Sequence, residues 1–220
     1  MDLCLKGIAM AIKGIPATVG VSLIAVALGI ILGLGLALMK MSKHKLLKIP
    51  ATVYIEIVRG TPMIVQALIM AYGVPYLIQS QGAEFRWPDL VIPAIMVCGL
   101  NSAAYVAEII RAGLQAVDSG QMEAARSLGM PHAMAMRLII IPQAFRIILP
   151  SLGNEFVSLI KETAILSYVG VVEILRRAAL WNASEFETFP AYIGAAVCYL
   201  MLTIPLSKLV AYVERRMATK

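Results

Sequence analysis

The sequence has few of the residues that soluble proteins use on their surfaces and in their metal sites. Charged residues make up 15% of its 220 positions, against about 25% in soluble domains. It has two histidines and three cysteines, and Cys4, Cys98 and Cys198 are too widely spaced for a disulfide framework or a metal knuckle. Hydrophobic residues make up 60% of the chain. This composition excludes a disordered chain, a nucleic-acid-binding arm and an ordinary soluble enzyme, and it predicts a protein that lies mostly in lipid.

Motifs for nucleotide binding and for common hydrolytic chemistry are also missing. The chain has no G-x-x-x-x-G-K-[ST] phosphate loop, no H-E-x-x-H zinc motif and no G-x-S-x-G nucleophile motif. His44 and His132 stand alone, which favours loop or helix-start positions over metal ligands. We therefore predict a protein that is not an enzyme and that holds no cofactor. If ATP drives its activity, ATP and Mg must bind to a partner chain.

Long apolar stretches predict an all-α membrane protein with five spanning helices. Because an α-helix rises about 1.5 Å per residue, about 20 apolar residues cross a hydrocarbon core about 30 Å thick. The fourth stretch is interrupted by Pro142, Arg146, Pro150 and Glu155, so we expect it to begin as an interfacial helix. We treat residues 1–220 as a single domain. The predicted spans are 15–39, 52–80, 89–112, 142–161 and 188–211.

The distribution of positive charge predicts the orientation of these spans. Placing the amino terminus outside puts the loops 40–59, 111–146 and 208–220 inside, and these hold 13 of the 19 Lys and Arg residues. The outer regions hold the other six. Because cytoplasmic loops of membrane proteins carry an excess of Lys and Arg, this bias predicts an outer amino terminus and an inner carboxyl terminus.

A polar segment between the third and fourth spans predicts a cytoplasmic helix at about 119–130. Asp118 and Gln121 are spaced as a helix cap and its N3 partner. Gly129 is typical of a helix stop, and Pro131 of the start of the next helix. Two interpretations are open at this point: the helix docks on a partner, or it lies on the surface with its charged face in water.

The run EAARSLGMPHAMAMRLIIIPQAFRIILPSLGNE, which contains this helix, resembles the EAA motif of ABC importer permeases. Glu123, Ala124, Ala125 and Gly129 match the first part of the motif, and the Ile-Leu-Pro run at 148–150 matches its end. Other stretches resemble the polar amino-acid branch of that family, and they lie at 54–66, 101–117 and 152–170. The resemblance extends from about residue 15 to residue 213 and implies the type I importer permease architecture.

The resemblance also implies a function and a set of partners. It implies a permease of an ATP-driven amino-acid importer in the bacterial inner membrane. Such a permease pairs with a second permease subunit, identical or paralogous, and docks on an ABC ATPase dimer. It receives its amino acid from an extracytoplasmic binding protein, and no nucleic-acid partner is expected. The EAA helix would be the coupling helix, with ATPase contacts from Glu123, Ala124, Ala125, Arg126 and Gly129.

Polar residues inside two consecutive spans predict that the two helices line one polar cavity within the membrane. Charges at the centre of a bilayer cost about 2.5–3.5 kcal/mol on insertion scales, so they usually face the protein interior or a wet cavity. The polar residues of each span recur at spacings of three, four and seven, which places them on one stripe of the helix. These residues are Asn101, Tyr105 and Glu108 on the third span and Glu155, Ser158, Lys161 and Glu162 on the fourth. The resemblance to amino-acid permeases with a site inside the membrane implies that substrate binds between these two helices, and it adds Thr163 to the predicted substrate residues.

Within this site an amino acid would bring one carboxylate and one ammonium. Lys161 would meet the carboxylate, and Glu155 or Glu162 would meet the ammonium. A Glu rather than a Gln at position 155 favours a cationic cargo such as arginine, lysine or histidine. Two alternatives stay open: Lys161 and Glu162 form a pair at the outer water interface, or an ion gradient acting through Glu108 and Glu155 drives a secondary transporter or a channel subunit. Secondary transporters more often show internal repeats.

Several shorter patterns concern packing. Gly29 and Gly33 form a G-x-x-x-G pair, which is typical of closely packed membrane helices. Pro62 predicts a break in the second span just after Arg59. Glu56 is spaced three residues before Arg59, so the two are expected to pair there.

The segment 163–187, between the last two spans, is predicted to be an outer amphipathic region. Its charged residues, Glu173, Arg176 and Arg177, recur at helical spacing. We interpret them as a polar outer face, positioned to contact the binding protein.

Overall fold

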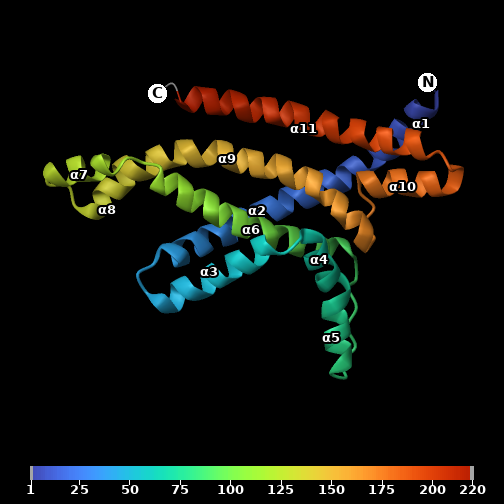
Figure 1. Cartoon of the computed structure of the whole chain (residues 1–220), viewed down its shortest axis with the longest axis horizontal. Coiled ribbons are helices and arrows are strands. Elements are labelled where there is room, and N and C mark those ends of the chain that lie inside the picture. Colours follow the sequence, from blue (N-terminus) through green and yellow to red (C-terminus); the bar gives the residue numbers. More distant parts are fainter. Residues whose placement is uncertain (1, 219–220) are drawn as a thin grey trace.

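The computed structural model of the chain describes residues 2–218, and these form helices joined by short turns, with no strand among them (Figure 1). Met1 and residues 219–220, at the ends of the expected 1–220 domain, lie outside the described residues. The elements in chain order are α1 Asp2–Ala11, η1 Ile12–Gly14, α2 Ile15–Met41, α3 Lys45–Gly60, α4 Met63–Leu68, η2 Ile69–Gly73, α5 Val74–Ser80, α6 Val91–Gln115, α7 Ser119–Ser127, α8 His132–Ala135, η3 Met136–Ile140, α9 Ile141–Glu162, η4 Thr163–Val169, α10 Ile174–Glu185 and α11 Thr188–Ala218.

Five helical runs among residues 2–218 are long and apolar enough to cross a membrane, as the sequence predicts. Two of them begin earlier than the predicted spans, because α1 leads through η1 directly into α2 and α8 leads through η3 directly into α9. The runs are Asp2–Met41, Met63–Ser80, Val91–Gln115, His132–Val169 and Thr188–Met217.

The expected second span, 52–80, is interrupted in the structure. Thr61 and Pro62 adopt extended backbone angles and separate α3 from α4. Proline lacks an amide hydrogen and pushes the residue before it out of the helical region, which explains why the break falls here. The apolar run that follows the break begins at Met63.

Two glycines of α2 allow it to pack closely against α6. A Cβ atom added at Gly29 would lie 2.8 Å from the Ser102 hydroxyl, and one added at Gly33 would lie 2.7 Å from Cγ1 of Val106. Both distances are shorter than real Cβ contacts, so the two backbones approach as closely as they do only because these positions lack side chains. The structure confirms the expected role of this glycine pair.

Glu173 differs from the expectation that it lies on a polar outer face. Its side chain is fully buried and caps the start of α10, where its carboxylate accepts hydrogen bonds from the backbone amides of Leu175 and Arg176 at 2.9 and 2.7 Å. The Tyr199 hydroxyl of α11 donates a further bond to the same carboxylate. Helical spacing alone cannot show this, because the neighbours of Glu173 come from distant segments: Tyr199 of α11 bonds its carboxylate, and Gly14 packs against its backbone.

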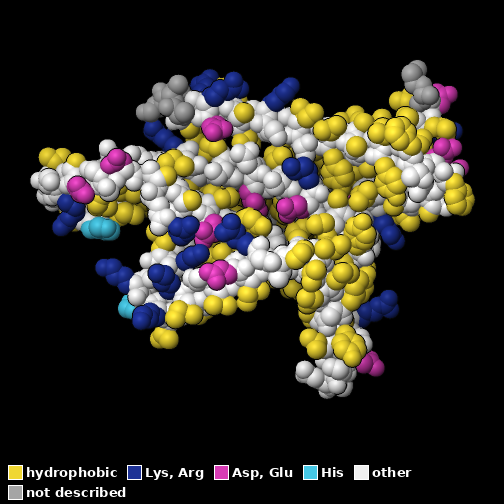
Figure 2. All heavy atoms as spheres, in the orientation of Figure 1, with side chains coloured by type: hydrophobic (Ala, Val, Ile, Leu, Met, Phe, Trp, Pro, Cys, Tyr) yellow, Lys and Arg dark blue, Asp and Glu magenta, His cyan; other side chains and the backbone are white. Residues whose placement is uncertain are grey.

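The start of α1 and the end of α11 lie at opposite ends of the molecule (Figure 1). Helices α7 and α8 project at the end that also carries the end of α11 and the turn between α2 and α3. Figure 2 shows Lys and Arg side chains gathered toward this end and broad hydrophobic areas over the rest of the face. Large apolar side chains are widely exposed, Ile31 by 69% and Tyr76 by 71%, which suits contact with lipid or with another membrane subunit.

Candidate functional site

The break between α3 and α4 is held by one side chain. The Gln66 amide nitrogen donates hydrogen bonds to the Val58 carbonyl at 2.8 Å, to the Thr61 carbonyl at 3.1 Å and to the Thr61 hydroxyl at 2.8 Å. Its side-chain oxygen accepts a bond of 3.1 Å from the amide of Asn101 on α6. Gln66 therefore satisfies backbone groups that the break leaves free and ties the break to the third span.

A pocket of about 400 Å³ opens beside this break. Three of the predicted substrate residues line it: Asn101 and Tyr105 from α6 and Glu162 from the end of α9. Arg59 also lines the pocket, a position that helical spacing does not predict, and its guanidinium lies 5.3 Å from the centre of the Tyr105 ring. The full lining consists of Arg59, Gly60, Thr61, Pro62, Met63, Asn101, Tyr105, Glu162 and Ile165.

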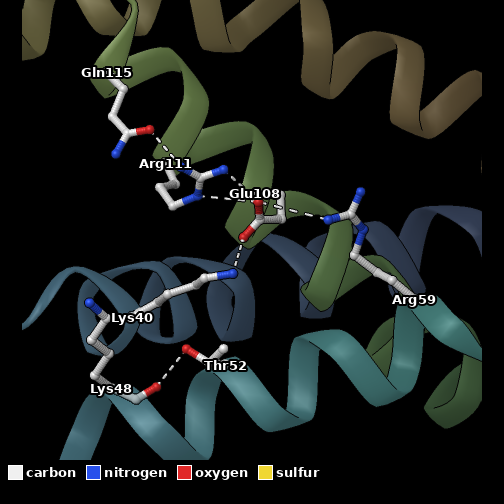
Figure 3. Close-up of polar contacts among 7 residues, drawn as sticks. All are labelled: Lys40, Lys48, Thr52, Arg59, Glu108, Arg111 and Gln115. Carbon is white, nitrogen blue, oxygen red and sulfur yellow. Dashed lines mark hydrogen bonds and ion pairs between the residues drawn. The ribbon is translucent and has the colours of Figure 1, made fainter. Parts of the chain in front are cut away.

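Glu108 does not line this pocket but forms the centre of an ion cluster (Figure 3). Its carboxylate lies 2.8 Å from the Lys40 ammonium of α2 and 2.8 Å from the Arg111 guanidinium of α6. Arg59 of α3 approaches the same carboxylate at 3.7 Å, so the expected partner Glu56 is replaced by Glu108. The cluster thus joins α2, α3 and α6.

The remaining predicted substrate residues lie elsewhere on α9 and η4. Glu155 accepts a hydrogen bond of 2.9 Å from the Ser102 hydroxyl, and Ser158 is half-buried. Lys161 is exposed, whereas Thr163 is fully buried and donates to the Ile160 carbonyl. None of these four side chains lines the pocket beside the break.

Position along the helix axis explains why the polar residues of one helical stripe do not all line the same pocket. Glu155 and Glu162 share a face of α9, but seven residues of helix separate them by about 10 Å along the axis. The same separation applies to Asn101 and Glu108 on α6. A pocket at one depth therefore receives only part of each stripe.

Helix α7 has defined caps at both ends. The Asp118 carboxylate accepts a bond of 2.6 Å from the Gly120 amide at the start. At the other end the Gly129 amide donates to the Arg126 carbonyl and the Met130 amide donates to the Ala125 carbonyl, which is the Schellman pattern. Gly129 has a φ of +81°, in the left-handed region that glycine adopts without strain.

The predicted coupling residues lie mostly on the outside of α7. Glu123, Ala124, Arg126 and Gly129 are exposed, and Ala125 faces inward with 2% exposure. The Arg126 guanidinium donates to the Met130 carbonyl at 2.8 Å and reinforces the turn. The arrangement presents a short, rigid helix with small side chains at one end of the molecule (Figure 1).

Gln121 does not complete a reciprocal cap with Asp118. Its side-chain oxygen accepts a bond of 3.2 Å from the amide of Gln143 on α9. This contact links α7 to the helix that leads into the fourth apolar run, so α7 is tied to a spanning element as well as to its own loop.

The sequence profile of one family, described as "Binding-protein-dependent transport system inner membrane component", matches residues 3–219. The chain belongs to this family. A putative glutamine transport system permease protein GlnP of Rickettsia typhi is 39% identical over 206 residues, which cover 94% of this chain and 92% of the relative. The arginine transport system permease protein ArtQ of Bacillus subtilis is 36% identical over 206 residues, covering 94% and 91%.

A solved structure, the crystal structure of an amino acid ABC transporter with histidines, superposes with a TM-score of 0.88 at 45% identity and covers 96% of both chains. The inward-facing MetNI methionine ABC transporter has a TM-score of 0.74 at 17% identity, covers 94% of this chain and 96% of that chain, and supports the fold alone. These comparisons confirm the resemblance to ABC importer permeases and the type I fold. They do not favour the alternative of a secondary transporter.

Proposed function

We propose that the chain is the transmembrane permease subunit of an ATP-driven amino-acid importer in the bacterial inner membrane. The observation that carries this proposal is the pocket of about 400 Å³ at the α3/α4 break, where polar side chains of α6 and α9 meet. Small-molecule sites commonly occupy about 300–1,000 Å³. Interrupted membrane helices commonly form the substrate sites of transporters. The glutamine and arginine permeases among the relatives support an amino acid as the cargo.

In this proposal Glu162 receives the ammonium of the amino acid, and Asn101 and Tyr105 form the wall on α6. Glu155 lies about 10 Å further along α9 and acts on the side chain of the cargo, favouring a positive charge. Its carboxylate is held by Ser102, which keeps it oriented. The pocket and Glu155 then mark successive points of one path through the membrane.

Coupling to ATP is assigned to α7. Its exposed, capped surface, comprising Glu123, Ala124, Arg126 and Gly129, docks on an ABC ATPase dimer that binds ATP and Mg. A second permease subunit completes the transmembrane dimer, and an extracytoplasmic binding protein delivers the amino acid. The amino terminus lies outside and the carboxyl terminus inside, because the more basic end of the molecule also carries α7.

Reconstituted transport tests this function. Proteoliposomes would contain the chain, its cognate ATPase and its binding protein, with a panel of labelled amino acids and with or without lumenal ATP. We expect uptake that requires ATP and stops when the phosphate-loop lysine of the ATPase is replaced. Uptake driven by an ion gradient without ATP would contradict the proposal.

A further inference from the structure

Arg59 occupies the boundary between the pocket and the ion cluster around Glu108. It lines the pocket from the last turn of α3, and its Nη1 atom lies 3.7 Å from Oε2 of Glu108. Figure 3 shows Glu108 between Arg111 and Arg59, with Lys40 reaching it from α2. One guanidinium therefore belongs to two sites.

Of the three cations around Glu108, Arg59 is bound least tightly. Lys40 and Arg111 both donate hydrogen bonds to the carboxylate at 2.8 Å, whereas the 3.7 Å approach of Arg59 is too long for one. One negative charge already has two hydrogen-bonded positive partners. Lys40 and Arg111 repel the third cation, Arg59. Binding of a second anion beside Arg59 is therefore electrostatically favourable.

The pocket also keeps charges of opposite sign apart. Glu162 reaches it from α9 and Arg59 from α3, and none of the ion pairs found in residues 2–218 joins them. A zwitterion can therefore place its ammonium at one and its carboxylate at the other. Arginine is well suited to the second task, because its planar guanidinium binds a carboxylate through two parallel hydrogen bonds.

We propose that Arg59 binds the α-carboxylate of the cargo and leaves Glu108 when it does so. This assignment rests on the proposed amino-acid transport. It gives Arg59 the role that the sequence suggested for Lys161, which is exposed and outside the pocket. Because the Glu108 cluster joins α2, α3 and α6, cargo binding loosens one contact between these helices and is sensed beyond the pocket.

The position of Arg59 supports such an exchange. Its side chain is 44% exposed, so it is not locked by packing. The Tyr105 ring, 5.3 Å from the guanidinium, offers a cation–π contact that persists while the hydrogen-bond partner changes. Arg59 also stands directly before the break at Thr61 and Pro62, so its partner influences the segment that connects α3 to α4.

The test measures direct binding to the purified complex of this chain with its ATPase, without the binding protein, since that protein would impose its own selectivity. The probes are L-glutamine and L-arginine, each compared with its α-carboxamide. We expect the wild type to prefer the free carboxylate by about tenfold or more. Arg59→Gln should abolish this preference, and Arg59→Lys should restore part of it. Arg86→Gln, which removes a cation from the exposed loop after α5 and touches neither the pocket nor Glu108, should keep it.

A second arm tests the exchange itself. Glu108 competes with the cargo carboxylate for Arg59, so Glu108→Gln should tighten amino-acid binding several-fold. This gain should disappear when Arg59→Gln is added, as in a double-mutant cycle.

If Arg59→Gln does not fold, the Arg59→Lys and Glu108→Gln measurements still decide the role of Arg59. Equal binding of acid and carboxamide by the wild type, or a full preference in Arg59→Gln, would overturn the role of Arg59 while ATP-driven uptake stands. Absence of ATP-driven uptake of every amino acid would instead overturn the proposed function.

Discussion

The amide of Asn101 donates a hydrogen bond of 3.1 Å to the side-chain oxygen of Gln66, and this contact joins the third apolar run to the residue that holds the break between α3 and α4. Asn101 is 4% exposed, so its amide is committed to this contact. Gln66 in turn bonds three oxygen atoms of Val58 and Thr61. The position of Asn101 in the wall of the pocket thus depends on its hydrogen bond to Gln66.

Gln66→Glu should destabilise the break. A carboxylate cannot donate to the Val58 and Thr61 carbonyls, and it leaves these acceptors without their partner, at a cost of about 1–3 kcal/mol. Gln79→Glu is a matched control, because Gln79 makes one exposed bond to the Phe85 carbonyl. The melting temperature of the purified transporter should fall clearly more for Gln66→Glu than for the control. Equal shifts would contradict the role of Gln66.

Gly33→Ala should separate α2 from α6, whereas Gly35→Ala in the same helix should not. A Cβ at Gly33 would lie 2.7 Å from Val106 and 2.9 Å from the Ala103 carbonyl, while a Cβ at Gly35 meets nothing within 4 Å. Overpacking of this kind costs about 1–3 kcal/mol. Thermal unfolding of the two variants measures the difference, and a Gly33→Ala protein as stable as Gly35→Ala would refute the close packing.

Gly129→Ala should uncouple transport from ATP hydrolysis. The residue needs a φ of +81°, which costs a side-chain-bearing residue about 1–2 kcal/mol, so the turn after α7 should distort. Amino-acid binding should persist while ATP-driven uptake falls. Gly82→Ala is the control, because Gly82 has a φ of +85° and the same open surroundings but lies in the loop after α5. Normal uptake by Gly129→Val would count against coupling through α7.

The stability of the protein should fall as pH rises through the titration of Glu173. Burial raises the pKa of this carboxyl, although hydrogen bonds from Tyr199, Leu175 and Arg176 oppose the rise. The folded chain therefore keeps a proton that the unfolded chain has lost, so the stabilisation is complete below about pH 4.3 and is lost as pH rises through the raised pKa.

Melting curves across this pH range check that prediction. Glu173→Gln cannot titrate, so its melting temperature should be lower overall, with one capping oxygen lost, but less dependent on pH. Glu185→Gln, at the exposed end of the same helix, should follow the wild-type profile. A pH dependence that survives unchanged in Glu173→Gln would assign it to another group.

Glu155→Gln should lower arginine uptake more than glutamine uptake. The amide oxygen of glutamine can still accept the bond from Ser102, so the substitution removes charge and little else. Glu84→Gln removes a charge from the exposed loop after α5 and should leave the ratio of the two rates unchanged. Initial rates in the reconstituted system measure this ratio. Undiminished arginine uptake by Glu155→Gln would argue against charge selection at this position.

Part of the candidate site could be predicted from helical spacing, and part could not. Spacing correctly placed Asn101 and Tyr105 on one face of α6, and both line the pocket with Glu162. It does not indicate depth, so it groups Glu108 with Asn101, which lies about 10 Å away along α6. Spacing does not bring Arg59 or Gln66 into the site, because periodicity cannot be followed across a break. Their signal was the Thr-Pro pair between them, which marks exposed backbone that polar side chains must satisfy.

The sequence by itself determined the all-α fold, the five apolar runs, the break at Pro62 and the two ends of α7. These features depend on a few adjacent residues: the length of an apolar run, an Asp that caps, a Gly that takes a left-handed turn. Only the tertiary structure decided that Glu108 pairs with Lys40, 68 residues away, and that Tyr199 covers Glu173. Which helix packs over a charge, and at what depth, depends on contacts between distant segments that no local pattern records.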